Sequence, residues 1–195
     1  IGAESSKPGF IEVPIDKQIS RILPIISEIK KISDDITISI DTRSSKVAES
    51  ALKEGANIIN DVSSGNNDKN MFDVVAKYNA DIILTHMPDE HLTSDNIKCD
   101  DILENVEDYF REQINQAVKS GISQNNIIID PGICFGTSGN DNIKLLSNMK
   151  YLVSVFDRVC IGVSNKRFSS KIFKGIKDSE MKIAALTIST LATCS

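Results

Sequence analysis

Short apolar runs alternate with longer segments of helical periodicity along the chain. The runs are rich in β-branched residues, as is typical of buried strands in a parallel sheet. They cover Ile36–Ile40, Asn57–Ile59, Asp81–Leu84, Ile127–Ile129 and Val159–Val163. Amphipathic periodicity predicts helices over Ile15–Lys31, Ser44–Glu54, Lys69–Tyr78, Asp101–Lys119, Asn142–Lys150 and Ser179–Thr193. This alternation predicts a parallel α/β architecture, in a single domain over residues 1–195.

Polar residues follow each of the five apolar runs. They are Asp41-Thr42, Asn60-Asp61, Thr85-His86, Asp130-Pro131-Gly132 and Ser164-Asn165-Lys166. The carboxyl ends of parallel strands lie on one side of a sheet, and in a closed βα barrel they converge on one mouth. Any single residue of this kind is often only a helix N-cap or an Asx turn. Five of them in register predict a shared polar site.

Two carboxylates and an amide in this set, Asp41, Asp130 and Asn60, suit a ligand that offers several N–H donors. The 2-amino-4-oxo-pyrimidine edge of a pterin or a guanine presents such donors side by side. A lysine on the opposite side would meet a ring carbonyl or a ring nitrogen. Metal binding by the same carboxylates is the alternative. It is less well supported, because the residues come from separate strands without a close acidic cluster.

Composition narrows the class of partner. The net charge of −5 argues against nucleic acid or an anionic membrane as the main partner, and no apolar run approaches the roughly 18 residues of a membrane span. Four widely spaced cysteines without a C-x-x-C pair predict reduced thiols in a cytoplasmic protein. His86 and His91 do not share the spacing of one helix face, so no histidine metal site is expected. We expect His86 to orient the loop at its strand end.

The motifs at these strand ends resemble those of the dihydropteroate synthases. Ile1–Gly9 (IGAESSKPG) is similar to the family's loop after the second barrel strand. The motifs IDT (40–42), IIND (58–61), THM (85–87), DPGICFG (130–136) and SNKRF (164–168) follow in the family's order. The resemblance runs through nearly the whole chain and implies a (β/α)8 TIM barrel, recorded here without its first and last strands.

The resemblance also implies an activity. The family is a group of transferases that condense 6-hydroxymethyl-7,8-dihydropterin pyrophosphate with p-aminobenzoate. The products are 7,8-dihydropteroate and pyrophosphate, in folate biosynthesis. A Mg²⁺ cofactor, two small-molecule substrates, a homodimer formed through the last helices and a role as a sulfonamide target are implied with it.

Site residues carry over from the resemblance motif by motif. Asp130 and Lys166 are implied as catalytic. The implied pterin-binding residues are Asp41, Asn60, Val62, Thr85, Asp130, Gly162 and Lys166. The implied aminobenzoate-binding residues are Ser6, Lys7, Pro8, Phe135, Lys166 and Arg167. No magnesium ligand is implied within this chain, and no cysteine is given a catalytic role, since the reaction needs no covalent nucleophile.

The sequence also departs from the family pattern. The first strand and the last strand, whose Arg-x-His pair serves pyrophosphate, are expected outside the sequence, which we therefore expect to be a piece of a longer chain. Lys7 occupies the position of the family's loop arginine. Lysine keeps the positive charge but lacks the planar guanidinium group with its paired donors. Asn165 stands for the arginine of S-R-K, and Thr137 for a common lysine.

Two other functions stay open. One is the pterin-binding, methyltransferase-type barrel that passes a methyl group to a corrinoid, although such domains usually lack the ESSKPG loop and the S-x-K-R-F ending. The other is a barrel that binds a pterin without turnover.

Overall fold

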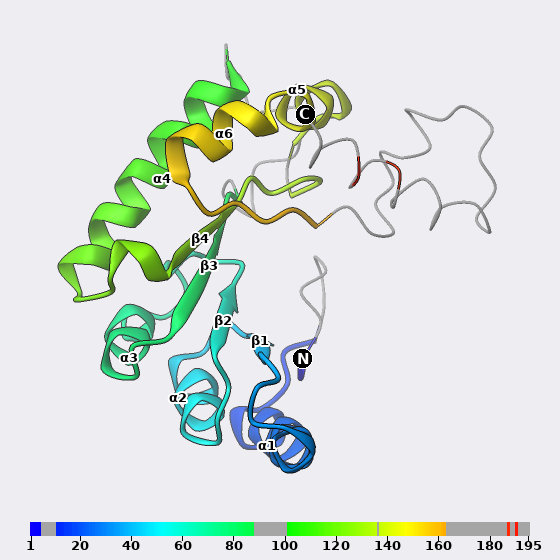
Figure 1. Ribbon diagram of the computed structural model, residues 1–195, viewed down its shortest axis with the longest axis vertical. Coiled ribbons are helices and arrows are strands. Elements are labelled where there is room, and N and C mark those ends of the chain that lie inside the picture. The colour runs from blue at the N-terminus through cyan, green and yellow to red at the C-terminus, as the bar shows by residue number, and fades with distance from the viewer. Residues whose placement is uncertain (5–10, 88–100, 136, 163–186, 188–189, 191–195) are drawn as a thin grey trace. The chain divides into compact units, whose positions relative to one another are not determined.

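The computed structural model describes residues 1–4, 11–87, 101–135, 137–162, 187 and 190, which form an α/β structure (Figure 1). Its strands are β1 (Ser39–Asp41), β2 (Ile58–Asp61), β3 (Asp81–Thr85) and β4 (Ile127–Asp130). Its helices are α1 (Ile15–Ile32), α2 (Ser45–Lys53), α3 (Met71–Lys77), α4 (Ile102–Lys119), α5 (Gly139–Ser147), α6 (Met149–Phe156) and the short 3₁₀ helix η1 (Gln124–Asn126). The predicted alternation of strands and helices is confirmed.

The strands form one sheet in the order β1-β2-β3-β4, in which β1–β2 and β2–β3 are parallel pairs. The chain gathers into two compact units. The first contains Ile1–Thr85 and Phe110–Ile128, and the second contains His86–Tyr109 and Ile129–Ser195. Strand β4 begins in the first unit and ends in the second, so Asp130 belongs to the second unit.

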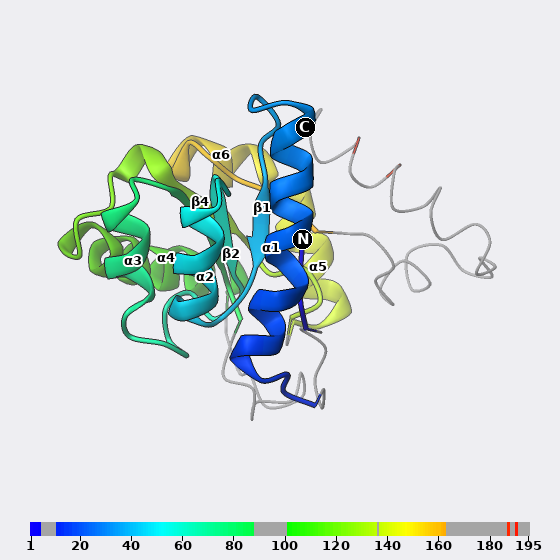
Figure 2. The same ribbon diagram turned by 90° about the horizontal axis from the view of Figure 1, so that it is seen from below.

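The core of the first unit lies under three helices. In Figure 1 the helices α1, α2 and α3 lie outside the strands β1, β2 and β3, and Figure 2 shows α1 running along β1. Ile40, Ile59 and Ile82 are partners across the three strands, and each is 0% exposed. This buried row of β-branched residues explains why the strands read as apolar runs in the sequence.

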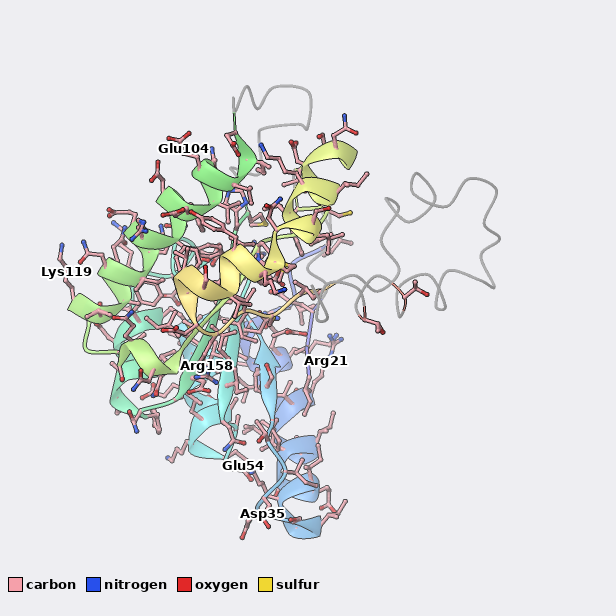
Figure 3. The ribbon with its side chains drawn as sticks, turned by 45° about the horizontal axis from the view of Figure 1, so that its top comes forward. Arg21, Asp35, Glu54, Glu104, Lys119 and Arg158 are labelled. Atoms are coloured by element: carbon pink, nitrogen blue, oxygen red, sulfur yellow. The ribbon has the colours of Figure 1, made fainter. Side chains whose placement is uncertain are left out.

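Helix α4 is amphipathic, as predicted. Val106 and Phe110 are fully buried, whereas Glu104 and Lys119 are exposed and point away from the helix in Figure 3. The acidic and basic residues of this segment therefore form a solvated helix face. Among the described residues no helix has both the length and the apolar character required to cross a membrane.

The predicted helix over Asn142–Lys150 is wrong in its bounds, because two helices, α5 and α6, replace it. Ser138 and Asp141 form a capping box, which starts α5 at Gly139. Asn148 then leaves the helical region (φ −116°, ψ 24°), and its Nδ2 donates to Lys144 O at 2.8 Å. No glycine or proline marks this break, so no local signal in the sequence predicted it.

The strand bounds differ in one consistent way. Strands β1, β3 and β4 include the first of the polar residues that were expected to follow them, and β2 includes both, so that the strands end at Asp41, Asp61, Thr85 and Asp130. The predicted strand Val159–Val163 is described only to Gly162 and contributes a single bridge, between Val159 and Ile129. The predicted helix over Ser179–Thr193 lies outside the described residues, apart from helical positions 187 and 190.

Candidate functional site

Asp41 and Asn60 form a pair at the carboxyl ends of β1 and β2. They are register partners, and Asn60 Nδ2 donates to Asp41 Oδ1 at 2.6 Å. The backbone holds both in place, since Asp41 N donates to Ile1 O at 2.8 Å and Thr42 N donates to Asn60 O at 3.1 Å. The structure therefore brings together two of the predicted pterin-binding residues, with Asp41 exposed and Asn60 half-buried.

The other end of the Asn60 amide has no hydrogen-bond partner among the described residues. A carboxylate only accepts hydrogen bonds, so the Asn60 NH₂ group must face Asp41 and the orientation of the amide is fixed. Asn60 Oδ1 is then buried, and no group in the described part of the chain donates to it. Buried acceptors are nearly always paired, and an unpaired one costs about 1–3 kcal/mol. The atom is therefore suited to an N–H donor of a ligand.

Asp61, the residue after Asn60, is 0% exposed. Its Oδ1 accepts from Ser63 N at 2.9 Å and from Ser63 Oγ at 2.6 Å, and its Oδ2 accepts from Gly65 N at 2.8 Å. Burial raises the pKa of the Asp61 carboxyl, and these hydrogen bonds act against the rise. The sequence placed Asp61 in the predicted polar site as part of the Asn60-Asp61 strand ending, but gave it no role of its own. The only indication of such a role in the sequence was that Asp61 directly follows Asn60. Side chains alternate along a strand, so the Asp61 side chain points to the face of the sheet opposite that of Asn60.

Val62 and Thr85 lie in the same unit. Val62 is half-buried, and Thr85 is 1% exposed at the end of β3. Ser64 Oγ donates to the Thr85 carbonyl oxygen at 2.8 Å, which ties the loop after β2 to the end of β3. Four predicted pterin-binding residues, Asp41, Asn60, Val62 and Thr85, thus occupy consecutive strand ends of the first unit.

In the second unit, Asp130 is fixed by the tight turn that follows β4. Its Oδ1 accepts from Gly132 N at 2.9 Å, and its carbonyl oxygen accepts from His86 N at 2.8 Å. Gly132 has a φ of +74°, and a Cβ on it would lie 1.8 Å from His86 O. Only glycine fits there, so the Asp130-Pro131-Gly132 sequence presets the direction of the carboxylate.

Gly162, Phe135 and Cys160 belong to the same unit as Asp130. A Cβ on Gly162 would lie 3.8 Å from Asp130 Oδ2, which is an ordinary van der Waals contact. Gly162 is therefore close to the carboxylate, but the available space would also accept a larger residue. Phe135 is half-buried, and its backbone N donates to Gly132 O at 2.9 Å. Burial and the charge of Asp130 raise the pKa of the Cys160 thiol to about 12, so this thiol stays protonated and is a poor nucleophile.

His86 is a buried residue with structural contacts. Its Nε2 lies 3.1 Å from Asn105 Oδ1, and its ring meets the Tyr109 ring edge-on at 5.0 Å. Burial lowers the pKa of His86, and the Asn105 contact partly opposes this. The described ranges contain no group of three His, Cys, Asp or Glu residues arranged to hold a metal. These contacts hold the His86 side chain against α4, and the loop-orienting role stays a prediction, because residues 88–100 lie outside the described residues.

The remaining predicted site residues, Ser6, Lys7, Pro8, Lys166 and Arg167, lie outside the described residues, as does His91. Of the described ones, Asp41, Asn60, Val62 and Thr85 are in the first unit, and Asp130, Phe135 and Gly162 are in the second. The structure therefore describes two separate sets of strand-end residues, each with its own hydrogen-bond network.

Comparison with known proteins gives a consistent result. A family profile described as "Pterin binding enzyme" matches residues 1–195. The dihydropteroate synthase of Clostridium beijerinckii is 38% identical over 166 residues, which cover 85% of this chain and 59% of that protein. The chain thus spans less than two thirds of this relative.

Two solved structures are similar in fold. A dihydropteroate synthase from Clostridium difficile, in the presence of pteroic acid, has a TM-score of 0.87 and 32% identity, over 98% of this chain and 70% of that one. The Xanthomonas albilineans dihydropteroate synthase with 4-aminobenzoic acid has a TM-score of 0.87 and 29% identity, over 98% of this chain and 67% of that one. The predicted fold class, part of a (β/α)8 barrel, is confirmed.

Proposed function

The chain belongs to the family of pterin-binding enzymes, and we propose that the protein is a dihydropteroate synthase. It would join 6-hydroxymethyl-7,8-dihydropterin pyrophosphate to p-aminobenzoate, giving 7,8-dihydropteroate and pyrophosphate. The observation that carries the proposal is the Oδ1 of Asn60, which is buried and has no partner among the described residues, beside the carboxylate of Asp41. Together these atoms form an acceptor edge of the kind that a pterin's N–H groups require.

The pterin ring is held, in this proposal, by acceptors at strand ends. Asp41 and Asn60 accept from adjacent donors of the 2-amino-4-oxo-pyrimidine edge, and Asp130 accepts from a further ring or amino N–H. The bond from Gly132 N orients the Asp130 carboxylate before the ligand arrives, which lowers the entropy lost on binding. Val62, Thr85 and Gly162 would line the slot, with Lys166 at the ring.

The aminobenzoate side would be formed by Ser6, Lys7, Pro8, Phe135, Lys166 and Arg167. The presence of 4-aminobenzoic acid in the Xanthomonas albilineans enzyme and of pteroic acid in the Clostridium difficile enzyme supports these substrates. The bond between the pterin methylene carbon and the pyrophosphate oxygen breaks, a bond to the aniline nitrogen forms, and that nitrogen loses a proton. Asp130 and Lys166 would act directly on the pterin, and the protein's main contribution is orientation of the two substrates.

Mg²⁺ is a proposed cofactor on the strength of kinship alone. Among the described residues no three His, Cys, Asp or Glu side chains are arranged to hold a metal, and Mg²⁺ commonly binds through only one or two carboxylates together with waters and substrate phosphates. Asp41 and Asp130 are proposed to act on the pterin, and the metal dependence stays a prediction. A cytoplasmic homodimer that sulfonamides inhibit is proposed on the same kinship, with no nucleic acid or membrane partner.

The test is product formation by the full-length protein. We expect purified protein with Mg²⁺, the pterin pyrophosphate and p-aminobenzoate to release 7,8-dihydropteroate and pyrophosphate in equal amounts, measured by mass spectrometry and a pyrophosphate assay. The product should be absent when either substrate is left out. Tight binding of the pterin pyrophosphate without any product would contradict the synthase proposal and favour a non-catalytic pterin-binding barrel.

A further inference from the structure

The loop after β2, residues 62–70, is connected to the ends of its own strand and of both neighbours. Towards β1, Asp68 Oδ2 accepts from Ser45 N at 2.8 Å, and Asn67 Nδ2 donates to Arg43 O at 3.2 Å. Towards β3, Ser64 Oγ donates to Thr85 O at 2.8 Å. One loop therefore links the three strand ends that carry Asp41, Asn60 and Thr85.

The buried Asp61 carboxylate lies at the base of this loop. It accepts two hydrogen bonds from Ser63 and one from Gly65, and it is 0% exposed. The backbone that it binds is strained, because Ser64 has a φ of +52°, which non-glycine residues rarely adopt. Such a conformation persists only where surrounding contacts impose it. Asp61 supplies three of those contacts.

The space around the loop leaves it little freedom. Gly65 has a φ of +82°, and a Cβ on it would lie 2.6 Å from Phe72 Cζ. Ser64 itself is 0% exposed, so its hydroxyl does not exchange freely between Thr85 O and water. The Ser64–Thr85 bond is consequently a fixed link between the loop and β3.

These contacts lie next to the proposed pterin residues and use none of their side chains. Val62 lies inside the turn that the bond from Ser63 N to Asp61 closes, Asn60 directly precedes Asp61, and the Thr85 backbone is held by Ser64. We propose that Asp61 and Ser64 are positioning residues, which set where Asn60, Val62 and Thr85 meet the pterin ring without touching it themselves. This inference rests on the proposed function.

Ser64→Ala tests the link to β3 with little change in volume. Loss of one buried hydrogen bond from the support of the slot should raise KM for the pterin pyrophosphate roughly threefold to tenfold. KM for p-aminobenzoate should stay within about twofold, because the link holds only pterin-side residues. The pterin dissociation constant, from calorimetry on the full-length protein, should rise by the same factor as the pterin KM.

Ser20→Ala is the matched control. Ser20 Oγ donates to Lys17 O at 2.9 Å, which is the same kind of bond on the exposed face of α1. This variant should leave both KM values and the pterin dissociation constant unchanged. The inference is overturned if Ser64→Ala behaves like Ser20→Ala, if it lowers the melting temperature without a change in pterin affinity, or if it raises both KM values equally.

Asp61→Asn is the second variant. The amide keeps the size of the side chain but replaces one acceptor by a donor, so at least one bond from Ser63 or Gly65 is lost. Pterin affinity should again fall while p-aminobenzoate KM is kept. If Asp61→Asn does not fold, Ser64→Ala decides alone. Absence of product from the wild-type protein would contradict the proposed synthase, whereas the pterin dissociation constants of the variants would still decide this inference.

Discussion

At the scale of single residues, two asparagines differ in how fully their side chains are hydrogen-bonded. The difference distinguishes a residue that stabilises the fold from one proposed to bind a ligand. Asn142 is 1% exposed and satisfied, since its Oδ1 accepts from Cys134 N and Thr137 Oγ at 2.8 Å each and its Nδ2 donates to Ser138 O at 2.7 Å. Asn60 has a partner only for its NH₂ group, and its buried Oδ1 has none among the described residues. Uncompensated groups of this kind are expected where a site gives up stability for binding.

Asn60→Leu should therefore separate affinity from stability. Removal of an unpaired buried acceptor should leave the unfolding free energy of the ligand-free protein within about 1 kcal/mol of wild type, while pterin affinity falls roughly tenfold or more. Denaturant unfolding and calorimetry measure the two quantities. Asn142→Leu, the control, should lower stability by about 1–3 kcal/mol, because it leaves buried partners unpaired. A stability loss as large as the control's, with pterin affinity intact, would contradict this assignment of Asn60.

At the scale of elements, the turn after β4 fixes the Asp130 carboxylate through a glycine that no other residue can replace. The bond from Gly132 N to Asp130 Oδ1 requires the backbone to turn at once after the strand. That turn brings Gly132 so close to the His86 carbonyl that only a hydrogen atom fits between them. The rigidity of this turn therefore comes from the backbone of the turn as a whole, and not from a single side chain.

Gly132→Ala should be among the most destabilising single changes in this turn. It combines a positive φ with a contact of 1.8 Å to backbone, so we expect a loss on the order of 3 kcal/mol or more in denaturant unfolding. Gly121→Ala is the matched control: φ is +98°, but the nearest atom, Ala76 Cβ, is 3.6 Å away. It should lose only about 1–2 kcal/mol, from backbone strain. Equal losses in the two variants would show that the close approach to His86 is absent.

Hydrophobic periodicity predicted the order of the elements, because each strand buries an apolar run under helices. It also predicted that Asp41 and Asn60 lie together, since parallel strands end on one side. It did not predict the break at Asn148 or the role of Asp61. The first depends on a single non-helical residue without a glycine or proline signal. The second depends on which of two adjacent polar residues faces the core and on a turn that closes around it.

At the scale of the whole molecule, one property of the fold accounts for the proposed site. Parallel strands carry their carboxyl ends on one side, so a short polar ending on each strand is enough to build a ligand edge from distant parts of the sequence. Asp41, Asn60 and Thr85 are such endings on β1, β2 and β3 of the first unit, and Asp130 is the ending of β4 in the second. The net charge of −5 is no obstacle, because recognition of the neutral pterin ring depends on local acceptors.

The central claim is that strand-end carboxylates hold the pterin, and a calorimetric titration of 6-hydroxymethylpterin into the full-length protein tests it most directly. Asp130→Ala removes the charged acceptor at the end of β4 and should weaken binding roughly 100-fold or more. Asp35→Ala, at an exposed aspartate before β1, should bind as the wild type does. Unchanged affinity in Asp130→Ala would contradict the account.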